Sequence, residues 1–172
     1  MKKVLQFAGI ISLALAVIAF ILFMATPGVA LKNSLTDQTS YYAGTTVIFG
    51  SKGTIAGLIA TETKPSALAL LAWIFILVGL LAECVSVVLP LLKVKALEKF
   101  SVIFDIAVCV LFVLAGIFAF IVVPTFYAAN GVDSVPSGAS IGAGWVIGGI
   151  LAIAAGAFAI LPAAAKFIGG KK

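Results

Sequence analysis

Four long apolar runs, separated by shorter polar segments, set the pattern of the sequence. The runs cover residues 4–24, 66–92, 100–123 and 141–165. Each is long enough for an α-helix to cross the hydrocarbon core of a bilayer, which takes about 20 residues. The pattern predicts an all-α membrane protein, a bundle of four transmembrane helices in which residues 1–172 form a single domain.

The composition of the chain supports lipid as its solvent. Hydrophobic residues make up 63% of the sequence and charged residues only 10%, whereas soluble proteins carry about 25% charged residues. A water-soluble domain of this length could not hide so much apolar surface. The first run follows Lys2 and Lys3, as in a signal peptide, and residues 28–30 offer a small-residue cleavage site. Because the run is longer than a signal-peptide core, we expect it to be retained as a helix.

The lysines predict how the helices are oriented. With a cytoplasmic N-terminus, eight lysines are internal and three are external, which is a clear positive-inside bias. The internal ones are Lys2, Lys3, Lys93, Lys95, Lys99, Lys166, Lys171 and Lys172, and the external ones are Lys32, Lys52 and Lys64. Both termini are then cytoplasmic, and residues 25–65 and 124–140 form external loops. The small size, the lysine-only basic residues and the lack of external cysteines lead us to expect a bacterial cell-membrane protein.

The first external loop is too long for a simple turn and contains a strand-like pattern. Residues 45–49 and 54–60 are β-branched and apolar, and they flank a turn-forming segment at residues 50–53. This composition predicts a small external β-hairpin. Because an isolated hairpin is marginal in water, we expect it to lie on the membrane surface or to pair with a neighbour.

The second and fourth runs share a spacing that suggests a duplication. Trp73 is followed by Pro90, and Trp145 by Pro162, in both cases seventeen positions later. Two helical hairpins related by an axis along the membrane normal would give this pattern. The alternative is that any helix of this orientation favours an outer Trp and tolerates an inner Pro.

Small residues recur every fourth position along the fourth run. They are Gly144, Gly148, Ala152 and Gly156. Such a stripe lets another helix approach closely, and it is a candidate packing seam. The neighbour is either a helix of the same bundle or a second copy of the chain, and the sequence does not separate the two.

Two acids, Glu83 and Asp105, lie inside otherwise apolar runs. A charge in hydrocarbon costs from about 2.5 to more than 10 kcal/mol, so such residues are paired, protonated or in use. The short link between the second and third runs makes their helices antiparallel neighbours, and both acids fall in the cytoplasmic half. Two carboxyl groups that meet in a low dielectric would share a proton. Asp105 alone could also reach towards the cytoplasm, so Glu83 is the stronger lead.

Three interpretations of these acids stay open. They form a structural hydrogen-bonded cluster, or a proton or cation site, or one of them pairs with a cationic residue of a partner subunit in the membrane. The candidate polar site comprises Glu83, Asp105, Ser86 and Ser101, with Ser12 and Gln6 as further hydrogen-bonding partners.

Other chemistry has little support in the sequence. The chain contains no His and no Arg, which removes imidazole chemistry and the usual bidentate recognition of phosphate and base edges. Cys84 and Cys109, together with the two acids, lack the spacing of a known metal site. There is no nucleophile–base pair and no Gly-rich phosphate loop. We expect no enzyme activity, no cofactor and no nucleic-acid binding.

The predicted plan has internal termini, a long first external loop with strands and a shorter second loop. In this topology the chain resembles claudin-type tetraspan proteins. The Trp and the paired Cys that this resemblance implies for the first external segment are missing, so no claudin residue or function carries over.

These observations predict a non-enzymatic multi-pass membrane protein. We expect it to act as a scaffold or subunit that associates with a membrane-protein partner, or with copies of itself, through its helices and first external loop. The alternative is a small proton- or cation-coupled transporter or channel subunit that uses Glu83 and Asp105.

Overall fold

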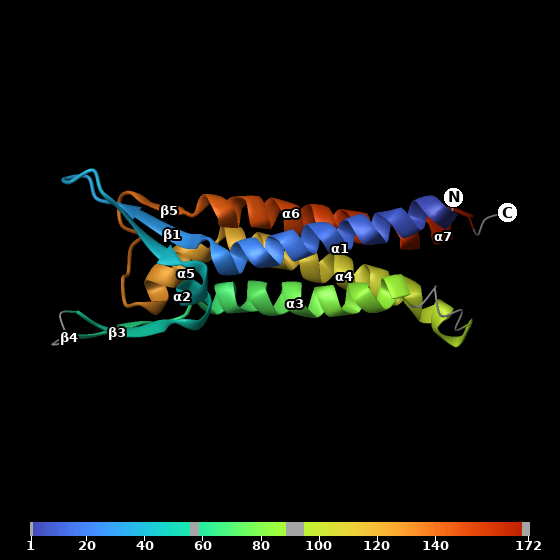
Figure 1. Ribbon diagram of the computed structural model, residues 1–172, viewed down its shortest axis with the longest axis horizontal. Coiled ribbons are helices and arrows are strands. Elements are labelled where there is room, and N and C mark those ends of the chain that lie inside the picture. The colour runs from blue at the N-terminus through green and yellow to red at the C-terminus, as the bar shows by residue number, and fades with distance from the viewer. Residues whose placement is uncertain (1, 56–58, 89–94, 170–172) are drawn as a thin grey trace.

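The apolar runs form four long helices in the computed structural model, which describes residues 2–55, 59–88 and 95–169 (Figure 1). The helices are α1 (Lys2–Ala25), α3 (Ala67–Val88), α4 (Lys95–Phe120) and α6 (Ala143–Ala159), the last continued by α7 (Leu161–Gly169). Along them, in the part of the chain that the structure describes, four stretches of 19 to 23 residues are apolar enough to cross a membrane. The prediction of four helices able to span a bilayer is confirmed.

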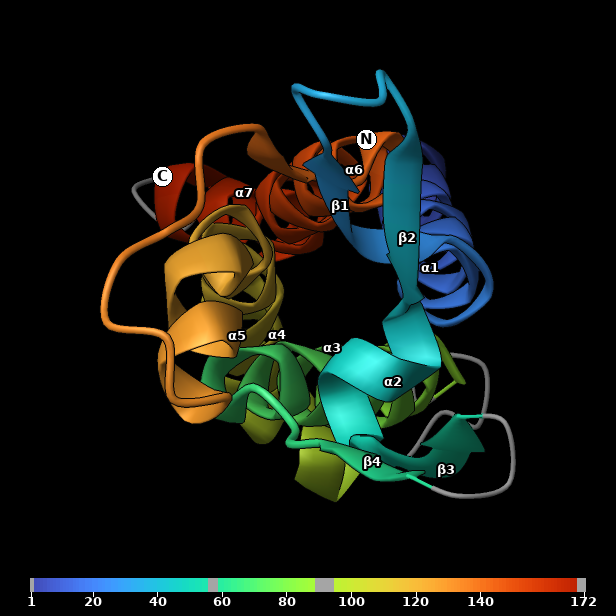
Figure 2. The same ribbon diagram turned by 90° about the vertical axis from the view of Figure 1, so that its left-hand side faces the viewer.

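The four helices form a ring. Helix α1 lies against α3 and α6, and α4 lies against the same two helices, so that α1 and α4 are diagonal partners (Figure 2). Helix α1 begins and α7 ends at the same end of the bundle, which we call the terminal end (Figure 1). The connections 26–66 and 121–142 both lie at the opposite end.

Two prolines decide where the third and fourth helices are interrupted. Helix α4 stops at Phe120, and α5 (Val122–Ala129) continues it beyond the predicted end at residue 123. Helix α6 stops at Ala159, one residue before α7 begins. The ring of a proline clashes with the carbonyl group four residues earlier, and Pro124 and Pro162 are each placed to disturb the helix at these breaks. The predicted end of the second run, at residues 89–92, lies outside the described residues.

The prediction that residues 45–49 form a strand is wrong, because they belong to a short helix, α2 (Gly44–Phe49). Val47 and Ile48 are fully buried, and α2 packs against α1 and α3. Gly50, with φ 77°, ends the helix by donating its N–H to the Thr46 carbonyl over 2.8 Å. A run of five residues is too short for its periodicity to separate a helix from a strand, and here burial at the end of the bundle selects the helix.

A hairpin is nevertheless present in the first connection, a few residues further along. Strand β3 (Ser51–Ile55) pairs antiparallel with β4 (Ile59–Thr63), with Ser51 opposite Thr63. The segment 50–53, predicted as the turn, therefore lies largely within β3. The predicted strand at residues 54–60 spans the ends of both strands and the connecting residues 56–58, which lie outside the described part of the chain.

A second, three-stranded sheet joins the two connections, and the sequence did not predict it. Strands β1 (Pro27–Lys32) and β2 (Thr39–Ala43) come from the first connection, and β5 (Ala139–Ile141) comes from the second. The order is β2-β1-β5, and both pairings are antiparallel. We call the two sheets together with α2 and α5 the platform. The claudin-type plan implied strands in the first connection, and β1 to β4 lie there.

The proposed duplication stays a prediction. Trp145 is fully buried, whereas Trp73 is half-buried and its ring lies 5.1 Å from that of Phe49. The two tryptophans thus have different surroundings. Pro90, the proline that would match Pro162, lies outside the described residues.

Candidate functional site

Glu83 lies on the face of α3 that meets α1, and only 2% of its surface is exposed. Gly9 lets the two helices approach, since a Cβ at that position would be 3.6 Å from Glu83 Oε1 and 3.1 Å from the Val87 side chain. The Ser12 hydroxyl, one turn further along α1, hydrogen-bonds the Glu83 carboxyl group. Ser12 Oγ is also 2.9 Å from the Ala155 carbonyl oxygen of α6, a second acceptor for the one hydroxyl hydrogen. Ser12 therefore connects three helices at one buried point.

Asp105 lies on α4 and is also buried, with 4% of its surface exposed. Its Oδ1 accepts a hydrogen bond of 2.6 Å from the Ser86 hydroxyl on α3. Ser101, one turn earlier on α4, is buried as well. Of the predicted polar site, Ser86 is thus brought to Asp105, while Glu83 takes its partner from α1.

The two carboxyl groups are close enough to interact electrostatically. With Ser12 and Ser86 they form a polar cluster that involves all four long helices, and we call it the carboxyl cluster. Neither the close approach of α3 at Gly9 nor the Ala155 carbonyl was predicted. The sequence does not indicate how closely two helices approach or which backbone carbonyl accepts a hydrogen bond. Gln6, the other predicted partner, has a side chain outside the described part of the structure.

The carboxyl cluster is not extended by further ligand-type side chains among the described residues. No group of three or more His, Cys, Asp or Glu there could hold a metal ion. Cys84 is exposed on the surface of the bundle and Cys109 is half-buried. The cluster offers two carboxyl groups and two hydroxyl groups, which can form hydrogen bonds and exchange protons.

The small residues along α6 are occupied by contacts within the chain. A Cβ at Gly148 would lie 2.7 Å from the Phe23 ring of α1, and one at Gly156 would lie 2.9 Å from the Cys109 carbonyl oxygen of α4. A Cβ at Gly144 would overlap the Thr26 hydroxyl, and Ala152 is fully buried. This candidate seam therefore faces α1 and α4.

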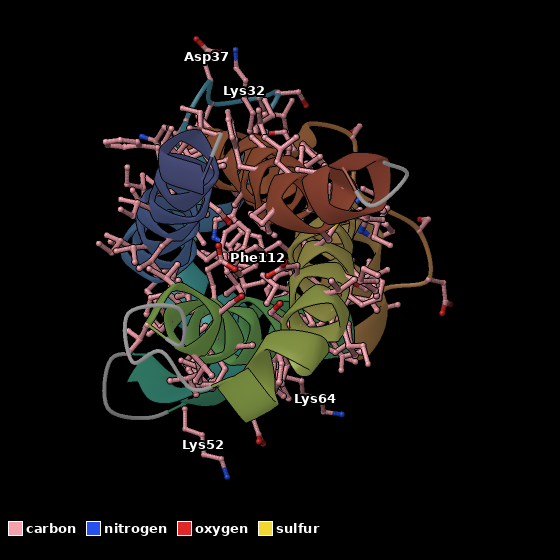
Figure 3. The ribbon with its side chains drawn as sticks, turned by 90° about the vertical axis from the view of Figure 1, so that its right-hand side faces the viewer. Lys32, Asp37, Lys52, Lys64 and Phe112 are labelled. Atoms are coloured by element: carbon pink, nitrogen blue, oxygen red, sulfur yellow. The ribbon has the colours of Figure 1, made fainter. Side chains whose placement is uncertain are left out.

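Large side chains fill the interior of the bundle between the carboxyl cluster and the platform. Phe23, Phe112 and Ile76 are fully buried, and Figure 3 shows Phe112 between the four helices. Gly79 gives room for that ring, since a Cβ on it would lie 2.5 Å from Phe112 Cε1. The interior at this level is packed with protein atoms.

Trp145 of α6 joins α6 to the end of α1, and strand β1 of the platform packs against it. Its indole N–H donates to the Phe23 carbonyl over 3.1 Å, and the two rings lie 5.0 Å apart. Phe23 is in the last turn of α1, where backbone carbonyls lack helical partners. Gly28 in β1 passes beneath the indole, since a Cβ on it would be 3.1 Å from Trp145 Cε2. Helix, strand and ring thus meet in one buried contact.

Side chains also fasten the two connections to each other. Asn130 at the end of α5 accepts from the Lys64 N–H over 2.8 Å and donates to the Lys64 carbonyl over 3.1 Å. The Ser66 and Thr125 hydroxyls are 2.8 Å apart. Burial, and to a smaller extent the neighbouring Tyr42, raises the pKa of Tyr127. These contacts hold the platform as one unit.

Two open surface depressions lie on the platform side of the molecule. One, of about 240 Å³, lies between Phe49 and the start of the β3–β4 hairpin. The other, of about 300 Å³, lies between the β1–β2 turn and Gly138.

Comparison with protein-family models and with curated proteins finds no match for this chain.

Proposed function

We propose that the chain is a non-enzymatic multi-pass protein of the bacterial cell membrane, with both termini cytoplasmic, that acts as a scaffold or subunit. In this proposal the helices anchor the platform outside the cell, and the platform binds a partner protein. The observation that carries the proposal is the bracing of the platform. Strands from both connections share one sheet, and Asn130 joins the two connections through the Lys64 backbone. The platform meets the bundle where Gly28 of β1 packs against Trp145 of α6 and where the Gly44 N–H of α2 donates to the Thr26 carbonyl just beyond α1.

The open edge of β2 supports a partner that adds a strand. In the described residues β2 pairs with β1 on one side only, and its sequence Thr-Ser-Tyr-Tyr-Ala contains no charge and no proline. Proteins usually protect a free edge with charged residues, proline or a bulge. The β1–β2 pair has one bulge, between Pro27 and Val29, next to the end of β2 at Ala43. The rest of this edge offers its N–H and C=O groups to an extended segment of another chain.

The test is to place a charge on this edge and compare it with the same charge elsewhere. Tyr41 is 65% exposed in β2, and Leu35, 93% exposed, lies in the turn next to it. Tyr41→Lys should abolish the complex that is captured by cross-linking in native membranes, while Leu35→Lys should retain it. Complexes that survive Tyr41→Lys, or a chain that shows no partner and no self-association in its native membrane, would overturn the proposal.

The carboxyl cluster favours a second candidate, a small proton- or cation-coupled transporter or channel subunit. Its specific support is the burial of Glu83 and Asp105 in one electrostatically connected cluster. Glu83→Gln and Asp105→Asn keep the shape and remove the charge. If these variants assemble normally but lose a pH- or cation-driven flux in liposomes, the scaffold proposal fails. If both merely misassemble and the wild-type protein shows no flux, the transport proposal fails.

A further inference from the structure

Lysines from three separate segments converge on the terminal end of the bundle. The backbone positions of Lys2 and Lys3 begin α1, those of Lys95 and Lys99 begin α4, and Lys166 lies in α7. Helix α7 contacts both α1 and α4, and Figure 1 shows the three segments at the same end. Three further lysines, Lys93, Lys171 and Lys172, lie outside the described residues.

Acidic residues do not balance these lysines. Among the described residues at the terminal end, Glu98 is the one acid outside the carboxyl cluster. Five lysines and one glutamate give this end a net charge of +4. If Glu83 and Asp105 were both ionised, the count would be five lysines and three acids. The net charge of the described residues at this end is therefore positive in either case, +4 when both acids are neutral and +2 when both are ionised.

The platform, in contrast, is balanced. It carries Lys32, Lys52 and Lys64 against Asp37, Glu62 and Asp133 among the described residues. Lys32 and Asp37 are 2.7 Å apart, and Lys52 and Glu62 are 3.7 Å apart. Figure 3 shows Lys32, the last residue of β1, beside Asp37 in the turn that leads to β2. The net charge of this end is zero.

We infer that the terminal end binds the anionic headgroups of the phospholipid leaflet in which it lies. Lysines at helix ends are at the depth of the headgroups, where anionic lipids attract them. The basic residues are all lysine, and the ammonium group acts as a compact point charge with no fixed geometry of contact. The lysines therefore form a basic surface that attracts negatively charged lipids without a fixed contact geometry. This inference rests on the proposed membrane-spanning function.

The test uses the full chain in vesicles of phosphatidylcholine with added phosphatidylglycerol. Spin-labelled lipids report which headgroup is enriched beside the protein. We expect phosphatidylglycerol to be enriched by about fivefold or more at about 0.01 M salt, and the enrichment to fall towards one at about 1 M salt, where the Debye length is about 3 Å. This salt series needs no variant, so it tests the inference even if a variant fails to fold.

Three sets of substitutions locate the effect. The first changes Lys2, Lys3, Lys95, Lys99 and Lys166 to Gln, and it should lose most of the enrichment. The second changes the same five residues to Arg and should keep it. The third changes Lys32, Lys52 and Lys64 to Gln and should also keep it, because those lysines belong to the balanced platform.

The possible failures are distinguishable. If the wild-type chain inserts into phosphatidylcholine vesicles but shows no preference for phosphatidylglycerol, only the lipid inference is overturned. The lipid inference is likewise overturned if the first Gln set keeps the wild-type preference or if the platform set loses as much. If the chain does not insert into vesicles at all, the membrane-spanning function fails, and the lipid inference fails with it.

Discussion

At the platform, backbone groups of both connections pair in a sheet, and lysines and acidic residues are equal in number. In the half of the bundle that contains the termini, buried side chains form hydrogen bonds between helices, and lysines outnumber the acidic residues. The same four long helices connect the two regions. The difference follows from the surroundings that each proposed location implies. A platform in water needs a defined shape and few unbalanced charges, while a helix end at a leaflet gains from attraction to lipid headgroups.

The largest effect should come from disturbing the contact between platform and bundle. A Cβ added by Gly44→Ala would overlap the Phe23 carbonyl oxygen and lie 2.8 Å from the Thr26 carbonyl oxygen, both of which are backbone atoms. We expect a loss of about 3 kcal/mol in the free energy of unfolding, measured by denaturation of the detergent-solubilised protein. Gly131→Asn is the control, since a Cβ there meets nothing within 4 Å and Asn tolerates its φ of 76°. Equal effects at both positions would contradict the tight junction.

Two tryptophans allow the same substitution to be compared within the bundle. Trp145→Phe removes the hydrogen bond to the Phe23 carbonyl and should cost about 2 kcal/mol. Trp73→Phe should cost less than about 1 kcal/mol, because the buried Trp73 N–H has no hydrogen-bond partner in the part of the chain that the structure describes. Thermal denaturation of both variants checks the order, and a larger cost at Trp73 would contradict a stabilising role for the hydrogen bond between Trp145 and the Phe23 carbonyl.

In the terminal half, single hydrogen bonds should matter less than this junction. Ser86→Ala removes the 2.6 Å hydrogen bond to Asp105, and we expect a cost of about 1 kcal/mol, as is usual between membrane helices. Ser40→Ala, on the exposed strand β2, is the matched control and should change stability by less than about 0.5 kcal/mol. A loss at Ser86 as large as that at Trp145 would mean that the carboxyl cluster contributes as much to stability as the buried Trp145 contact.

The smallest effect should come from the ion pairs on the platform. Lys52 and Glu62 are 83% and 60% exposed, and water and salt screen such pairs. Lys52→Gln should change the free energy of unfolding by less than about 0.5 kcal/mol. The melting temperature of the wild-type protein should respond as weakly to added salt as that of the variant. A marked loss would show that charge balance also stabilises the platform fold.

The sequence predicted the parts of the fold that depend on length and local composition. Apolar runs of transmembrane length identify four helices wherever they occur, and the short link after α3 placed Glu83 and Asp105 on neighbouring helices. The three-stranded sheet was missed because Val29 in β1 pairs with Ile141 in β5, far along the chain. Such pairings are specified by tertiary packing, and no local pattern reports them.

The sequence predicted which residues form the carboxyl cluster better than it predicted which of them hydrogen-bond to each other. The sequence indicated the two acids and their serines, since a polar side chain in an apolar run is conspicuous. It could not assign Ser86 to Asp105 and Ser12 to Glu83, because the rotation of each helix about its axis depends on small residues such as Gly9 and Gly79. It also could not indicate the Ala155 carbonyl as an acceptor.

The central claim is that the platform and the terminal end lie on opposite sides of a membrane, with the platform outside. It is tested most directly by labelling single cysteines with a membrane-impermeant maleimide, in a chain that carries Cys84→Ser and Cys109→Ser. Ser34→Cys probes the exposed turn of the platform, and Gly169→Cys probes the end of α7. The account predicts that the first reacts in intact cells and the second only after lysis. Equal labelling of both in intact cells, or labelling of Gly169→Cys alone, would contradict it.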